Sequence, residues 1–116
     1  MIDFTGSWKN QHGSRLELKV ADGVVTGQFE SGVGDGGEVL WVDINGKTVN
    51  DIITFNAIYT KYGTIVAWVG QHTESHGTGK IETLWIHATD IDDSEEKESI
   101  WSSNRIGSDT FVRTNN

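Results

Sequence analysis

The sequence contains no cysteine and no proline among its 116 residues. Without cysteine, the chain has no disulfide, no thiol nucleophile and no thiolate metal site. Basic residues are scarce, because 9 Lys and Arg stand against 17 Asp and Glu, for a net charge of −8. This acidic balance argues against nucleic acid and anionic membranes as partners. No apolar run is long enough for a membrane-spanning helix.

The length and the first residues set further bounds. A chain of 116 residues can bury one substantial core but not two, so we expect a single domain over residues 1–116. Met1-Ile2-Asp3 lacks the basic start and the apolar stretch of a signal peptide, so no signal peptide is visible in this chain.

Apolar residues recur with a period of two rather than 3.6, which indicates strands. Leu16, Leu18 and Val20 alternate with charged residues, and Asp22-Gly23 then favours a hairpin turn. The same reading predicts strands within residues 6–14, 15–20, 25–31, 38–44, 49–59, 63–71, 81–89 and 106–113. It also predicts a flexible loop over residues 32–37, a hairpin turn at residues 45–46 and an acidic connection over residues 90–98. Eight evenly spaced strands favour an all-β fold, an antiparallel up-and-down β-barrel.

Closure of such a barrel brings its first and last strands together. Asn10 and Ser14 lie in the first strand pattern, residues 6–14, and Asp109 lies in the last. All three are expected inside the barrel, beside tryptophan side chains. A polar cluster between aromatic walls suits a small ligand with a polar head.

Two neighbouring strands are apolar on both faces. Val66 and Trp68 share one face of the sixth strand, whereas Ile65 and Val69 share the other. Leu84 and Ile86 repeat the pattern on the seventh strand, opposite Trp85. A barrel wall that faces water is normally polar, so this outer surface is expected to form a subunit interface.

These residues resemble the avidin–streptavidin family. Five motifs match its strands in order, over nearly the whole chain: Trp8-x-Asn10-Gln11-x-Gly13-Ser14, Thr26-Gly27-x-Phe29-Glu30-Ser31-x-Val33-Gly34, Trp68-x-Gly70-Gln71, Thr83-x-Trp85 and Trp101 followed by Gly107-x-Asp109-Thr110-Phe111. The resemblance implies an eight-stranded barrel that binds biotin without catalysis, cofactor or metal. It also implies a homotetramer, in a secreted or periplasmic location.

The resemblance also implies roles at the ureido head of biotin. Asn10 and Ser14 would donate hydrogen bonds to the ureido oxygen, together with a tyrosine that is replaced here by Phe29. Ser31 and Asp109 would accept from the two ureido N–H groups. The carboxylate of Asp109 makes the strongest of these contacts, because its hydrogen bond is charge-assisted.

Other positions would enclose the rest of the ligand. Phe55, Trp68 and Trp85 would form its aromatic wall, and Trp101 would cover the site of a neighbouring subunit. Thr64 would meet the tail carboxylate, with a backbone N–H near Asp35, whose negative charge opposes that contact. Val66 stands in place of a threonine that meets the ring sulfur, and Phe55 in place of a frequent tryptophan. With Phe29, these changes are expected to weaken biotin binding without abolishing it.

Alternative functions remain open on the sequence alone. A lipocalin-like barrel could carry another apolar ligand, although it would not need Asn10, Ser14, Ser31 and Asp109 on one interior face. A small isomerase could use Asp109 as a base, although the sequence offers it no paired acid. His72 and His76 flank a turn but do not form a recognised metal motif.

Overall fold

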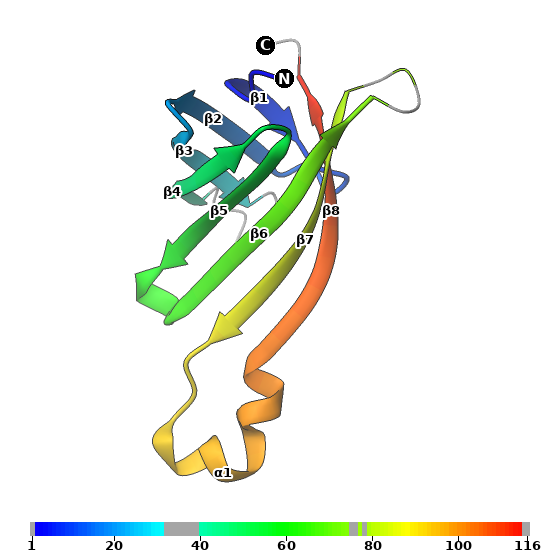
Figure 1. Ribbon diagram of the computed structural model, residues 1–116. Helices are drawn as coiled ribbons and strands as arrows, with labels where there is room; N and C mark the ends of the chain where they lie inside the picture. Colours follow the sequence, from blue (N-terminus) through cyan, green and yellow to red (C-terminus); the bar gives the residue numbers. More distant parts are fainter. Residues whose placement is uncertain (1, 32–39, 75–76, 78, 115–116) are drawn as a thin grey trace.

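The computed structural model describes residues 2–31, 40–74, 77 and 79–114. Its eight strands form a closed antiparallel barrel in which each strand pairs with the next and β8 returns to β1 (Figure 1). The strands are β1 (Gly6–Lys9), β2 (Arg15–Ala21), β3 (Val24–Ser31), β4 (Leu40–Val49), β5 (Ile52–Tyr59), β6 (Thr64–Thr73), β7 (Lys80–Thr89) and β8 (Asn104–Arg113). The expected up-and-down barrel is therefore confirmed.

Short helical segments occupy two of the connections. η2 (Thr60–Tyr62) joins β5 to β6, whereas η3 (Asp93–Glu95), α1 (Glu96–Ser99) and η4 (Ile100–Ser103) join β7 to β8. The acidic connection predicted after residue 90 therefore contains helical turns. None of the helices in the described residues has the length and apolarity needed to span a membrane.

The first hairpin turn lies where the sequence predicts it. Asp22 and Gly23, between β2 and β3, both have positive φ angles, of 52° and 76°. Positive φ at both central residues is typical of a type I′ turn, whose twist matches that of the paired strands. The Asp-Gly pair supplies this geometry because both residues tolerate it.

The prediction of a hairpin turn at Asn45-Gly46 is wrong. β4 continues through both residues to Val49, and the chain turns at Asn50, which has a φ of 55°. A Cβ on Gly46 would lie only 1.8 Å from the backbone oxygen of Thr54 on β5. This glycine thus allows two strands to approach closely inside a sheet, a role that sequence reading confuses with a turn.

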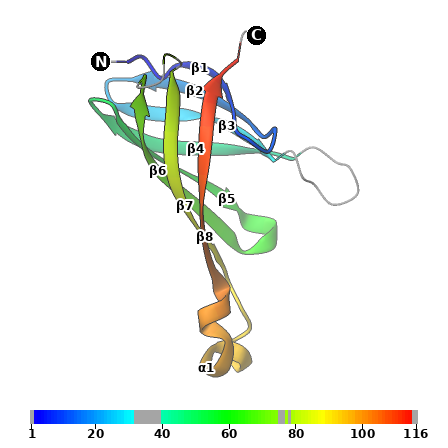
Figure 2. The same ribbon diagram turned by 90° about the vertical axis from the view of Figure 1, so that its right-hand side faces the viewer.

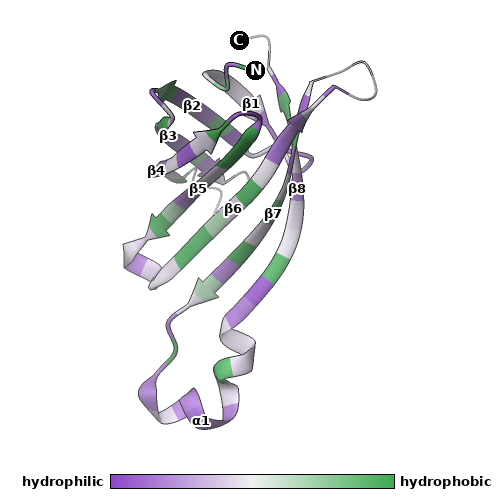
Figure 3. Ribbon diagram, viewed as in Figure 1, coloured by the Kyte–Doolittle hydropathy of each residue, from purple (hydrophilic) through white to green (hydrophobic). Residues whose placement is uncertain are grey.

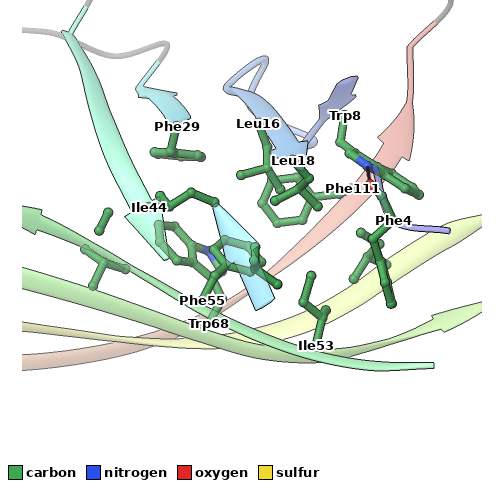
Figure 4. Close-up of a cluster of buried hydrophobic side chains, with 14 residues drawn as sticks. Phe4, Trp8, Leu16, Leu18, Phe29, Ile44, Ile53, Phe55, Trp68 and Phe111 are labelled. Carbon is green, nitrogen blue, oxygen red and sulfur yellow. Dashed lines mark hydrogen bonds between the residues drawn. The ribbon is translucent and has the colours of Figure 1, made fainter. Parts of the chain in front are cut away.

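Alternate residues of the strands point inward and form one apolar core (Figure 4). Trp8 is 1% exposed and its Nε1–H donates to the backbone oxygen of Phe4 at 2.9 Å. The guanidinium of Arg113, on β8, lies 4.2 Å from the centre of the Trp8 ring. Trp8 therefore helps to close the barrel where its first and last strands meet.

The barrel closes over only part of its length. β1 pairs with β8 only at Trp8 and Lys9, whereas β7 pairs with β8 from Lys80 to Ala88. β5 to β8 consequently run past the closed part, and the connection that contains α1 lies at their far end (Figure 2). The ends of these strands near the α1 connection therefore lie beyond the closed part of the barrel (Figure 2), and we call this the open end.

Large apolar side chains cover the outer face of β6, β7 and β8. Five of them are about half exposed or more: Ile65, Val69, Leu84, Ile86 and Ile106. Figure 3 shows hydrophobic positions recurring along these strands. The outward orientation predicted for the first four is confirmed, and Ile106 extends the same surface onto the last strand.

Candidate functional site

A buried carboxylate, that of Asp109, lies on the inner wall where three strands meet. The Trp68 indole Nε1–H donates to its Oδ2 at 3.0 Å. The Gln11 side-chain amide donates to its Oδ1, also at 3.0 Å. Thr83 donates its hydroxyl to the backbone oxygen of Asp109 at 2.9 Å. These contacts fix the carboxylate within the barrel, at 7% exposure.

Asn10 and Ser14 lie in the connection between β1 and β2. The Asn10 side-chain oxygen accepts from the backbone N–H groups of His12 and Ser14, at 3.0 and 2.9 Å. Asn10 and Ser14 are both buried. Because the oxygen is already occupied, the amide nitrogen is the group of Asn10 that is suited to donate to a ligand.

Gln11, the residue next to Asn10, contacts the carboxylate of Asp109 from the connection between β1 and β2. Besides Asp109, the Gln11 side chain bonds the backbone of β8 twice, donating to the Ser108 oxygen at 3.1 Å and accepting from the Thr110 N–H at 2.9 Å. Gln11 thus joins the first connection to the last strand. The position of Gln11 beside Asn10 in the first motif could have indicated a role in the site, but strand alternation alone gave it none.

The aromatic residues gather around Trp68, as the sequence predicts for an inner wall (Figure 4). The Phe55 ring stacks on Trp68 with centroids 4.9 Å apart and planes 21° apart. The Phe29 ring lies at the same distance, tilted by 52°. Trp85 is half-buried, faces Trp68 across β6 and β7, and covers Gly107 so closely that a Cβ there would lie 2.2 Å from its ring.

The remaining expected residues occupy different depths. Val66 is buried between Ala57 and His87 in the sheet. Thr64 lies at the open end, with its hydroxyl 3.1 Å from that of Thr89 and 3.2 Å from the Tyr62 oxygen that accepts from it.

Three expected residues remain, of which the structure describes two. Ser31 ends β3 and is half-buried, and Asp35 lies outside the described residues. Trp101, in η4, is 78% exposed and donates its Nε1–H to the Glu98 oxygen at 3.0 Å. Within the described residues, His, Asp and Glu side chains form no group of three that could hold a metal ion.

The fold and this inner wall define a class of protein: an antiparallel β-barrel that encloses polar groups and aromatic rings, as small-ligand-binding barrels do. The model of the avidin family matches residues 1–114 of the chain. The chain therefore belongs to the avidin family.

Solved structures show the same fold at low sequence identity. Xenavidin superposes with a TM-score of 0.84 at 21% identity, covering 97% of this chain and 98% of xenavidin. The biotin binding protein from chicken gives a TM-score of 0.82 at 20% identity, covering 97% and 96%. Apo shwanavidin gives 0.76 at 26% identity, covering 96% and 100%. The barrel is thus retained although most residues differ.

Proposed function

We propose that this chain is a non-catalytic, high-affinity biotin-binding protein that holds the ligand inside the barrel. The observation that carries the proposal is the buried carboxylate of Asp109, held by Trp68 and Gln11 beside a cluster of aromatic rings. A buried carboxylate is a strong acceptor for an N–H group in a dry site. An apolar ligand would have no N–H group to donate to this carboxylate.

The ureido ring of biotin has one oxygen and two N–H groups. The amide nitrogen of Asn10 and the hydroxyl of Ser14 donate to the oxygen, and Asp109 and Ser31 accept from the N–H groups. The family position that would supply a third donor to the oxygen holds Phe29, whose ring packs on Trp68 instead. One hydrogen bond is thereby lost, which costs about 0.5–1.5 kcal/mol, or more for a polarised group.

Apolar parts of biotin meet the aromatic residues. Phe55, Trp68 and Trp85 enclose the bicyclic ring and the beginning of the tail, and Val66 lies beside the ring sulfur without a hydroxyl to donate. In this proposal Thr64, at the open end, meets the tail carboxylate, and the backbone near Asp35 contributes there as well.

The protein acts as a homotetramer, with residues 1–116 as one domain of each subunit. The exposed apolar wall on β6, β7 and β8 supports the assembly, because Leu84 and Ile106 are 70% and 79% exposed in the isolated chain. Exposed Trp101 would then reach the site of a neighbouring subunit and cover the bound ligand. Family membership also supports a location outside the cytoplasm, secreted or periplasmic.

Two other functions receive less support. In the described residues Asp109 is bonded to Trp68 and Gln11, and neither is an acid that could pair with it in isomerase chemistry. A lipocalin-like carrier of another apolar ligand would leave the buried Asp109 unused.

Thermal unfolding in the presence of different ligands tests the proposal. A ligand that binds only the folded state raises Tm by an amount that grows with the logarithm of its concentration relative to Kd. Biotin should raise Tm strongly, whereas decanoate at the same concentration should leave it nearly unchanged. A shift with decanoate and none with biotin would favour the lipocalin-like carrier instead.

A further inference from the structure

Two basic side chains lie opposite each other on the inner face of β7 and β8. In the sheet register, His87 pairs with Arg105 on one side and with Val66 on the other. Trp85 and Thr83, two and four residues before His87, share its inward-facing side of β7, whereas Leu84 and Ile86 are exposed on the outer side. Directly opposite residues in an antiparallel pair have Cβ atoms about 4.5–5.5 Å apart. We call His87 and Arg105 the basic pair.

His87 carries an unsatisfied polar atom. Across the part of the chain that the structure describes, its Nδ1 is the one buried side-chain nitrogen or oxygen that lacks a hydrogen-bond partner. Buried polar atoms are nearly always bonded, because their lost hydration is otherwise uncompensated. An orphan atom on the inner face of a ligand-binding barrel is therefore suited to bond a ligand.

Arg105 is also free to bind. Its side chain is exposed, and it makes no hydrogen bond or ion pair with any described residue, among which Arg15 and Glu30 form the sole ion pair. A guanidinium can only donate, so the group that it meets must be an acceptor. In a chain with a net charge of −8, an unpaired arginine opposite a histidine is a local basic feature.

Further hydroxyl groups lie at the next inward-facing positions of the sheet, beyond His87 and Val66. Thr64 pairs with Thr89 on β7 and with Tyr59 on β5, all on inward-facing positions at this end of the sheet. Burial raises the pKa of Tyr59, so its hydroxyl stays protonated at neutral pH and can donate. The open end thus offers donors from Tyr59 on β5, His87 on β7 and Arg105 on β8 to one incoming acceptor.

We propose that His87 and Arg105 bind the carboxylate at the end of the ligand's tail and so make the protein selective for the free acid over amide or ester forms. This inference rests on the proposed biotin function. Arg105 and Asp109 lie four residues apart on β8, roughly 13 Å along the strand. That separation matches a ligand with its ureido head at Asp109 and an extended aliphatic tail that passes Trp85.

The comparison of biotin with biotinamide tests the inference directly. The two ligands share the ureido head, the ring and the tail, but biotinamide replaces the carboxylate with a neutral amide. Calorimetric titration at pH 7 should show biotin binding roughly tenfold tighter or more, as expected for one hydrogen bond to a charged group. Added salt should narrow the difference, because Arg105 is exposed.

Variants then assign the preference to the two residues. Arg105→Gln and His87→Leu should each lower the ratio of the two affinities, and the double variant should bring it close to one. Biotinamide affinity should stay near that of the unmodified protein, which shows that the head site and the fold survive. Lys47→Gln is the matched control. It also removes one positive charge, but from an exposed residue near the C-terminal end of β4, away from the basic pair on β7 and β8. It should leave the ratio unchanged.

The outcomes separate the two proposals. If both ligands bind with equal affinity to the unmodified protein, or if neither substitution changes the ratio, the basic pair has no role in recognition of the tail. If neither ligand binds at all, the biotin function itself is wrong, and the inference falls with it.

Discussion

The indole N–H of Trp68 donates to the carboxylate of Asp109 over 3.0 Å, from β6 to β8, in the buried interior. The bond joins the aromatic wall to the polar head of the proposed site. Trp68 also stacks on Phe55, so the position of the carboxylate depends on the packing of the wall. Affinity for a ligand head and stability of the wall are therefore coupled through this one contact.

Asp109→Ala should weaken biotin binding by about a hundredfold or more. Loss of a charged partner from a buried hydrogen-bonded pair costs about 2–5 kcal/mol. The barrel should still fold, because its core consists of apolar residues from all eight strands. Circular dichroism checks the fold, and calorimetry measures the affinity.

Asp109→Asn serves as the control for this experiment. It keeps an acceptor oxygen for Trp68 or Gln11 but removes the charge, so its loss of affinity should be smaller than that of the alanine variant. Unchanged biotin affinity in Asp109→Ala would mean that the ureido head does not lie at this carboxylate.

Phe29→Tyr and Val66→Thr should each slow biotin dissociation. Both side chains point inward and are nearly buried, at 6% and 8% exposure. A new hydroxyl bonded to the ligand contributes about 0.5–1.5 kcal/mol, and such gains arise mostly in the dissociation rate. The double variant should combine the two effects. Release of labelled biotin measures the rates.

The same substitutions can also fail in an informative way. A buried hydroxyl without a partner costs about 1–3 kcal/mol, and Phe29 is packed against Trp68. Faster release from both single variants and from the double variant would show that biotin lies differently from the proposed arrangement.

Light scattering in dilute neutral buffer should return the mass of a tetramer. The outer wall carries five exposed apolar side chains, which an interface would remove from water: Ile65, Val69, Leu84, Ile86 and Ile106. A monomer mass would remove both the interface and the role of Trp101 in a neighbouring site. In the tetramer, Trp101→Lys should loosen the assembly and speed biotin release together.

Gly107→Ala should lower biotin affinity through Trp85. The added Cβ would lie 2.2 Å from the Trp85 ring, so the ring must move away from its place opposite Trp68. Near-ultraviolet circular dichroism detects the movement, and calorimetry measures the affinity. Gly77→Ala is the control, because its Cβ meets nothing within 4 Å and costs only backbone strain at a φ of +80°. Equal biotin affinity in both variants would exclude Trp85 from the binding wall.

Strand alternation carried most of the fold prediction. Where one face of a strand is buried, as in Leu16, Leu18 and Val20, the period of two is clear. It failed at Asn45-Gly46, because a glycine that allows close strand approach has the same local signature as a glycine in a turn. Only the neighbouring strand, which brings the Thr54 oxygen to this position, distinguishes the two roles.

Most of the candidate site could be predicted from the sequence motifs. Asp109, Trp68 and Phe55 were assigned to the inner wall, and they are there. Gln11 was missed because its contacts to β8 span nearly a hundred residues of sequence. His87 was missed as well, since one histidine in an apolar strand is unremarkable until its pairing with Arg105 is known.

The most direct measurement is a calorimetric titration of the unmodified protein with biotin. The account predicts one biotin bound per chain, with high affinity and a favourable enthalpy from the hydrogen bonds at Asn10, Ser14, Ser31 and Asp109. Absence of heat, together with free biotin recovered in full after dialysis against the protein, would contradict it.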